Sequence, residues 1–117
     1  MGWFDRGGAR PMTISTAEVR DRLGAQARPT ILDVRTAAEF VGEGHIPGAV
    51  HVPLQRLLDD LGRLDRQQEY VVVCRSGARS AQAQRILLRA GFANVKNMQG
   101  GMLRWHGPVV HDGPPRR

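Results

Sequence analysis

The sequence predicts an α/β fold in which a mostly parallel β-sheet is covered by helices on both faces. Short apolar runs that suit buried strands alternate along the chain with runs whose apolar residues recur at helical spacing. The chain of 117 residues has the length of one domain and can bury roughly two-thirds of its unfolded surface. One domain built on one sheet therefore accounts for the whole pattern.

The first strand and the first helix are expected within residues 13–23. Ser15 and Glu18 have the spacing of a capping box, which marks the start of a helix after a short strand. Val19 and Leu23 lie one turn apart and supply the apolar face of that helix.

A second strand and a short helix are expected next. Pro29 breaks the first helix, and residues 30–34 (TILDV) form an apolar run of strand length. Residues 36–44 then suit one or two helical turns that begin at Thr36 as the N-cap and end at Gly42.

A third strand, over residues 49–53 (AVHVP), follows a turn at Pro47-Gly48. Residues 54–64 predict one amphipathic helix, because their leucines recur at helical spacing. These leucines are Leu54, Leu57, Leu58, Leu61 and Leu64.

The central strand is expected over residues 70–74 (YVVVC), the most apolar run of the chain. The helix that follows ends at Gly91, and its apolar face consists of Ala83, Ile86, Leu87 and Ala90. Residues 92–101 contain the last strand, and residues 100–107 contain a final turn of helix.

Three segments are expected along the chain: a flexible lead over residues 1–11, a folded domain over residues 12–108, and a disordered tail over residues 109–117. The first residues lack the apolar core of a signal peptide, and no apolar run approaches the ~18 residues that span a bilayer. We therefore expect a cytoplasmic protein with no membrane partner. The single cysteine cannot form an internal disulfide or supply a zinc site alone, so no metal is expected.

The formal net charge of +6 is carried by sixteen arginines and one lysine, and many proteins that bind nucleic acids are similarly basic. Here, however, the arginines are scattered, and aromatic residues make up 5% of the chain, too few for a base-stacking platform. The charge favours the attraction of small anions, and we expect no nucleic-acid partner.

The loop after the predicted central strand holds the reactive residues. Cys74 stands at the carboxyl end of that strand, where parallel sheets place their functional crevice. Gly77 permits a loop whose N–H groups turn inward, and the following helix directs its first N–H groups to the same point. Arg75 and Arg79 add positive charge, so the pKa of Cys74 should fall below ~8.5. These features favour a nucleophile over the inert core residue that a lone cysteine usually is.

Four stretches of the sequence have the order and spacing of a known family. They are ILDVRTAAEF, GHIPGAVHVP, VVVCRSGARS and NVKNMQGGMLRW. Together they resemble the single-domain rhodaneses, which are thiosulfate-type sulfurtransferases, over roughly Thr13 to Gly107. The resemblance implies a three-layer fold with a mostly parallel five-stranded sheet, and it implies no cofactor.

The resemblance also implies that Cys74 is the catalytic nucleophile. It would take the outer sulfur of a small anionic donor such as thiosulfate, become a persulfide, and pass the sulfur to cyanide, a thiol or a protein. Arg75 and Arg79 would bind the donor and stabilise its charge. The N–H groups expected to cradle the negative persulfide belong to Ser76, Gly77, Ala78, Arg79 and Ser80.

Two alternatives use the same cysteine. Related phosphatases and arsenate reductases have five residues between cysteine and arginine, whereas four separate Cys74 from Arg79, which suits a sulfur atom better than a phosphate. The loop also contains no aspartate that could act as a general acid. A carrier that relays persulfide sulfur between proteins stays open, as do the physiological donor and acceptor and the oligomeric state.

Asp33 and Arg35 alternate at the end of a predicted strand. We expect them to brace the site through an ion pair or a hydrogen bond rather than to take part in the chemistry. Glu39 is expected to join this network as the partner of an arginine.

Two histidines and a tryptophan could suggest further chemistry, but each is expected to have a structural role. His45 and His51 flank the IPGA turn at a spacing that fits no zinc motif. Trp105 is expected to be a packing anchor near the site.

Overall fold

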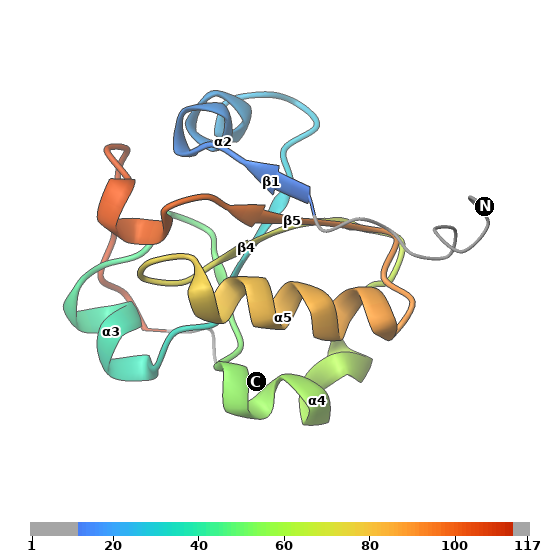
Figure 1. Ribbon diagram of the computed structural model, residues 1–117. Coiled ribbons are helices and arrows are strands. Elements are labelled where there is room, and N and C mark those ends of the chain that lie inside the picture. The colour runs from blue at the N-terminus through green and yellow to red at the C-terminus, as the bar shows by residue number, and fades with distance from the viewer. Residues whose placement is uncertain (1–11, 114–117) are drawn as a thin grey trace.

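The computed structural model describes residues 12–113 and has the predicted α/β architecture (Figure 1). Its strands lie in the order β1-β5-β4-β2-β3, and every neighbouring pair is parallel. The strands are β1 (Met12–Ile14), β2 (Thr30–Asp33), β3 (Val50–His51), β4 (Glu69–Val73) and β5 (Asn94–Met98). Because β4 lies between β5 and β2, its carboxyl end is in the middle of the edge at which all the strands end.

Helices cover both faces of the sheet, and Figure 1 shows α2 and α5 on opposite sides. The helices are α2 (Thr16–Leu23), α3 (Ala37–Gly42), α4 (Leu57–Asp60) and α5 (Ala78–Arg89). Side chains of β4 alternate between the faces: Val72 packs with residues of α4 and α5, whereas Val71 and Val73 pack with residues of α2 and α3. The central strand is therefore buried on both sides, as its continuous apolar run predicts.

The predicted starts of α2 and α3 are confirmed. Ser15 and Glu18 form a reciprocal capping box, and Thr36 and Glu39 form a second one. The predicted stop of α5 is also present, since Gly91 lies just beyond the helix and has φ of +93°.

The single helix predicted over residues 54–64 is wrong. Two 3-10 turns, Leu54–Arg56 and Leu61–Arg63, flank the short α4. Leu58 is 68% exposed, and the other leucines of the segment pack against the core. These core-facing leucines are three, four and three residues apart, and the tighter turn of a 3-10 helix keeps residues three apart on one face.

The third strand is shorter than predicted. Within residues 49–53, Val50–His51 pair with β2. The strand is at the edge of the sheet, and the chain leaves it at Val52, whose N–H still bonds to the carbonyl of Asp33 at 3.0 Å.

The C-terminal segment departs from the disorder predicted from residue 109 onward. Val110 and His45 exchange two backbone hydrogen bonds, each of 2.9 Å, in an antiparallel bridge. The ring of His111 lies 2.8 Å from a carbonyl oxygen of α3. Val110 and His111 are thus held against the folded domain by these bonds. The predicted lead and the end of the predicted tail, residues 1–11 and 114–117, lie outside the described residues.

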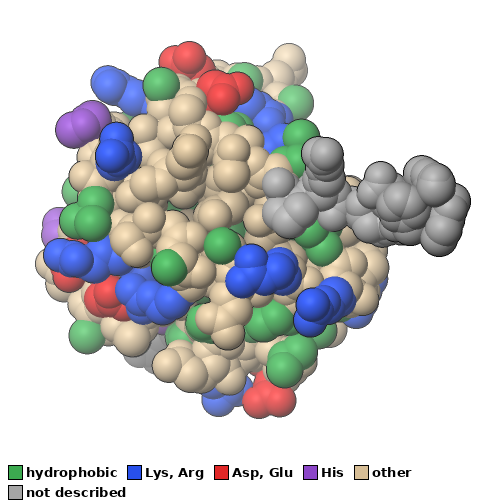
Figure 2. Space-filling model, in the orientation of Figure 1, with side chains coloured by type: hydrophobic (Ala, Val, Ile, Leu, Met, Phe, Trp, Pro, Cys, Tyr) green, Lys and Arg blue, Asp and Glu red, His purple; other side chains and the backbone are tan. Residues whose placement is uncertain are grey.

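The surface agrees with the scattered arginines of the sequence. On the face drawn in Figure 2, Lys and Arg side chains lie in several separate places, some of them beside Asp or Glu side chains. None of the helices within residues 12–113 is long and apolar enough to cross a membrane.

Candidate active site

Cys74 directly follows β4, and the loop that leads into α5 wraps around its sulfur. The residue is 0% exposed. Its Sγ accepts hydrogen bonds from the backbone N–H groups of Gly77 at 3.0 Å and Ser80 at 3.3 Å. The hydroxyl of Ser80 lies 3.2 Å from the same sulfur. These donors surround the Cys74 sulfur at the end of the central strand.

Gly77 allows the loop to make this turn. Its φ of +106° lies in the left-handed region, which residues with a Cβ rarely adopt. Gly77 is also the N-cap of α5, so that helix begins at once and directs the N–H groups of its first turn toward Cys74.

Opposing effects determine the pKa of Cys74. Burial raises it, because a thiolate is disfavoured away from water. Hydrogen bonds from the Ser80 hydroxyl and from the N–H groups of Ser80, Gly77 and Ser76 together outweigh burial, so the pKa of Cys74 lies below its ordinary value. Within the described residues, the N–H groups of Ala78 and Arg79 make no hydrogen bond to Cys74 Sγ itself, and the cradle of all five N–H groups around a terminal persulfide sulfur stays a prediction.

Asn97, on β5, belongs to the site and was missed in the sequence. Ser80 Oγ donates to Asn97 Oδ1 at 2.6 Å, and Asn97 Nδ2 donates to the carbonyl of Gly77 at 3.2 Å. Ser80 has one hydroxyl proton, so Asn97 and the Cys74 thiolate compete for it. The sequence signal was a polar side chain near the end of a predicted strand, and pairing of β5 with β4 brings it to the loop.

Arg79, in the first turn of α5, binds Glu39 of α3 through a bidentate ion pair. Both contacts, Nη1 to Oε1 and Nη2 to Oε2, are 2.8 Å long. The Arg79 hydrogen bond is the main reason that the pKa of Glu39 falls to about 2. Glu39 thus has an arginine partner, as expected, and the pair ties the loop to α3.

The expected ion pair between Asp33 and Arg35 is present, and both side chains are buried. Arg35 Nε lies 3.0 Å from Oδ1 of Asp33 and its Nη2 lies 2.9 Å from Oδ2. Nη2 also donates to the carbonyl of Gly44 at 2.8 Å. The pair joins the end of β2 to the turn after α3, beside the strand that delivers Cys74.

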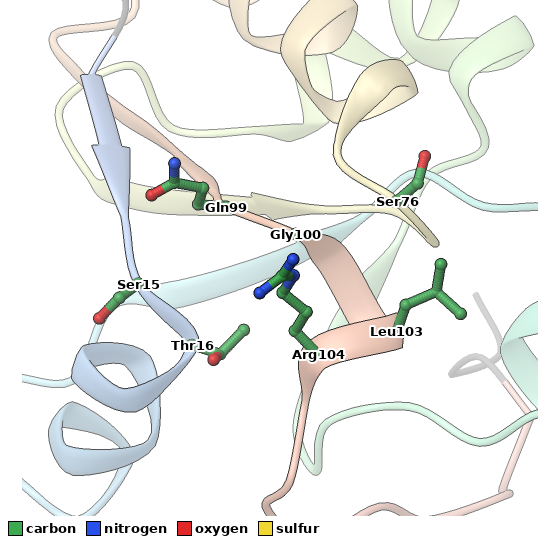
Figure 3. Close-up of a pocket in the computed structure, with 7 residues that line it drawn as sticks. All are labelled: Ser15, Thr16, Ser76, Gln99, Gly100, Leu103 and Arg104. Carbon is green, nitrogen blue, oxygen red and sulfur yellow. The ribbon is translucent and has the colours of Figure 1, made fainter.

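Two cavities flank the loop, and Leu103 lines both of them. The larger, about 620 Å³, is lined by Ser15, Thr16, Ser76, Gln99, Gly100, Leu103 and Arg104 (Figure 3). The smaller, about 190 Å³, is lined by Arg35, Glu43, Gly44, Arg75, Met102, Leu103, Trp105 and Val109. Each cavity includes one residue of the loop, Ser76 or Arg75, so small molecules can approach the loop from two sides.

A family model described as "Rhodanese-like domain" matches residues 15–108. The chain belongs to the rhodanese-like family. The match agrees with the resemblance carried by the four sequence motifs, and it spans strands β2 to β5 and the loop around Cys74.

Relatives of this rhodanese-like chain include named sulfurtransferases. A "Sulfurtransferase" of Allochromatium vinosum is 34% identical over 100 residues, covering 83% of this chain and 92% of that one. "Thiosulfate sulfurtransferase 16, chloroplastic" of Arabidopsis thaliana is 36% identical, covering 81% and 87%. The crystal structure of a rhodanese-like domain protein from Staphylococcus aureus has a TM-score of 0.79 at 31% identity, covering 86% and 99%.

The histidines and the tryptophan of this rhodanese-like domain have the expected structural surroundings. The buried ring of His45 stacks on Phe40 at 3.5 Å and lies 2.8 Å from its carbonyl oxygen. The ring of His51 also stacks on Phe40, with 4.4 Å between the ring centroids, and its Nε2 lies 2.8 Å from the carbonyl oxygen of Arg35. Trp105 is buried among the residues that pack with α2 and α3, and its Nε1 donates to Pro108 at 3.0 Å.

Proposed function

We propose that this chain transfers sulfane sulfur from thiosulfate or a similar anionic donor to a thiophilic acceptor through a persulfide on Cys74. The Cys74 thiolate forms a bond to the outer sulfur of the donor, and the sulfur–sulfur bond of the donor breaks. Sulfite leaves with the electron pair of that bond, and the terminal sulfur of the persulfide keeps the negative charge. Cyanide or a thiol then takes that sulfur and restores the thiolate.

One observation carries the proposal: the Cys74 sulfur lies inside a loop whose N–H groups approach it to 3.0 and 3.3 Å. Donors at that range stabilise the thiolate before the reaction and a negative sulfur after it. Four residues separate Cys74 from Arg79, which supports a ligand of one sulfur atom over a phosphate.

The two arginines of the loop differ in how they are bound, and this supports different roles. Both terminal nitrogens of Arg79 bind Glu39. Arg75 is about half-exposed, and its ion pair with Glu43 is loose, at 3.6 Å. We therefore assign contact with the donor's oxygens to Arg75, and we assign to Arg79 a fixed positive charge that holds the loop.

More kinds of molecule could act as the sulfur acceptor than as the sulfur donor. Cyanide, a low-molecular-weight thiol or a protein thiol could each attack the terminal sulfur, and the last would make the chain a sulfur carrier. We favour an enzyme, because small molecules have open approaches to the loop from two cavities. A reactive lone thiol must also be kept reduced, which supports a cytoplasmic location.

Mass spectrometry after thiosulfate treatment tests the proposal. We expect the intact protein to gain the mass of one sulfur atom and the Cys74→Ser variant to gain none. An unchanged wild-type mass, or the same gain in Cys74→Ser, would contradict the proposed persulfide. Turnover of thiosulfate and cyanide by the purified protein alone separates an enzyme from a carrier, since a carrier would need its protein partner.

A further inference from the structure

The buried guanidinium of Arg35 has one nitrogen that is not hydrogen-bonded. Nε and Nη2 bind Asp33 and the carbonyl of Gly44. Within residues 12–113, Nη1 is buried and no hydrogen-bond partner reaches it. A buried donor left unsatisfied is costly, and native structures contain few of them. An unsatisfied donor on an arginine that lines a cavity beside the reactive loop points to a ligand that binds there.

The carboxylate of Glu43 lies between this nitrogen and Arg75. Its Oε1 is 3.7 Å from Arg35 Nη1 and 3.6 Å from Arg75 Nε, both longer than a good hydrogen bond. The Glu43 side chain is 50% exposed, so it can swing into solvent. All three residues line the 190 Å³ cavity. Two cationic groups thus share one half-exposed carboxylate that is hydrogen-bonded to neither of them.

We propose that Glu43 is a specificity-determining residue: it competes with the anionic group of the sulfur donor for Arg35 Nη1 and Arg75. The inference rests on the proposed function and assigns a charge preference to it. A donor that enters the cavity must displace the carboxylate and remain near its charge. The repulsion from Glu43 alone should weaken binding roughly three- to tenfold for each negative charge of the donor, at a separation of about 6 Å and an effective dielectric of about 40 to 80. Glu43 therefore disfavours dianionic donors relative to monoanionic ones.

A purely structural role for Glu43 would predict other contacts. A brace would hold its partners at hydrogen-bond distance, as Glu39 holds Arg79 at 2.8 Å. The contribution of Glu43 to the end of α3 comes from its backbone N–H, which bonds to the carbonyl of Glu39 at 3.0 Å. Substitution of the side chain leaves that bond intact.

The test compares Glu43→Gln with Asp59→Asn, a matched control that removes one negative charge from an exposed position on α4. KM and kcat are measured with thiosulfate, a dianion, and with an organic thiosulfonate, a monoanion that delivers the same kind of sulfur. We expect Glu43→Gln to lower KM for thiosulfate roughly three- to tenfold and KM for the thiosulfonate less, with kcat little changed. Asp59→Asn should change neither. Equal effects on both donors, no effect, or the same effect in Asp59→Asn would overturn the inference.

Calorimetric titration with sulfite in the Cys74→Ser background measures the anion site without any sulfur transfer. We expect tighter sulfite binding after Glu43→Gln, by a factor similar to the fall in KM. If no persulfide forms but sulfite binds more tightly, the proposed function fails and the anion site stands. If the persulfide forms while neither sulfite affinity nor thiosulfate KM responds to Glu43→Gln, the inference about Glu43 is wrong.

Discussion

At the scale of single residues, the reactivity of Cys74 depends on a balance between burial and hydrogen bonding. Its side chain is buried, which alone would keep it a thiol, and the loop offsets this with donors aimed at one atom. Ser80 is the donor whose contribution is open to competition, since Asn97 accepts from the same hydroxyl at 2.6 Å. Ordinary side-chain substitutions leave the backbone N–H donors in place, whereas one substitution removes the Ser80 hydroxyl.

We expect Ser80→Ala to raise the pKa of Cys74, because the thiolate loses one hydrogen-bond donor. The rate of alkylation by iodoacetamide as a function of pH reports this shift. Ser76→Ala is the control, since it removes a loop hydroxyl and keeps the backbone N–H that acts on the sulfur. An unchanged midpoint in Ser80→Ala would show that the Ser80 hydroxyl donates its proton to Asn97 rather than to the Cys74 thiolate.

Arg75→Ala should weaken the use of thiosulfate more than the use of an uncharged persulfide donor. Loss of a partly exposed charge–charge contact should raise KM for thiosulfate roughly tenfold, and KM for the uncharged donor should change little. Steady-state kinetics with both donors measure the difference. Equal losses would show that Arg75 does not respond to the donor's charge.

At the scale of elements, the loop is held between α3 and α5. The Arg79–Glu39 pair connects the first turns of these helices, and Glu39 also closes the capping box of α3. One carboxylate therefore fixes both the start of α3 and the position of the reactive loop. The first turns of α2 and α3 have the same capping box, so substitutions of Glu18 and Glu39 can be compared within one molecule.

Glu39→Gln should destabilise the protein by about 1 kcal/mol and reduce turnover, because glutamine keeps the capping box but loses the ion pair with Arg79. Glu18→Gln makes the same change in the capping box of α2, where no arginine is bound to the carboxylate within the described residues. Urea unfolding and turnover of the two variants isolate the effect of the ion pair between Glu39 and Arg79. Equal effects of the two substitutions would mean that the Glu39–Arg79 ion pair contributes nothing beyond the capping box.

At the scale of the whole molecule, lowered carboxylate pKa values couple folding to pH. The pKa of Glu39 falls to about 2 and that of Glu69 is lowered, each chiefly through a hydrogen bond from an arginine. Glu69 on β4 binds Arg22 of α2 and Lys96 of β5. The Glu39–Arg79 pair holds the reactive loop, and Glu69 ties β4 to α2 and β5. Protonation of these two carboxylates should therefore loosen the fold at two places.

Stability should fall as the pH is lowered from about 5 toward about 2. A carboxyl whose folded pKa lies below its ordinary value near 4.5 binds its proton more weakly in the folded state, so its contribution is present above that value and is lost below it. Urea midpoints of wild type and Glu39→Gln across this range test the sign. The difference between them should shrink as the pH approaches about 2, and a constant difference would exclude Glu39 as the titrating group.

Local patterns in the sequence predicted much of this fold. The capping box of Ser15 and Glu18 and the N-cap at Thr36 are local signals, so the starts of α2 and α3 could be predicted, whereas the second capping box, of Thr36 and Glu39, was found only in the structure. The single helix predicted over residues 54–64 was wrong because leucines three and four residues apart fit the observed 3-10 turns and short α4 as well as one continuous α-helix. The ordered start of the predicted tail was also missed, because the two hydrogen bonds between Val110 and His45 join distant parts of the chain.

The sequence by itself determined that Cys74 stands at the end of a buried strand and that four residues, including Arg75 and Gly77, separate it from Arg79, because strand, turn and helix signals are local in the chain. The tertiary structure decided which of those arginines is bound, since Glu39 meets Arg79 across 40 residues of sequence. It also placed Asn97 beside Ser80 and Glu43 between Arg35 and Arg75. Such pairings depend on how parallel strands and their helices pack in space, and no spacing along the chain encodes them.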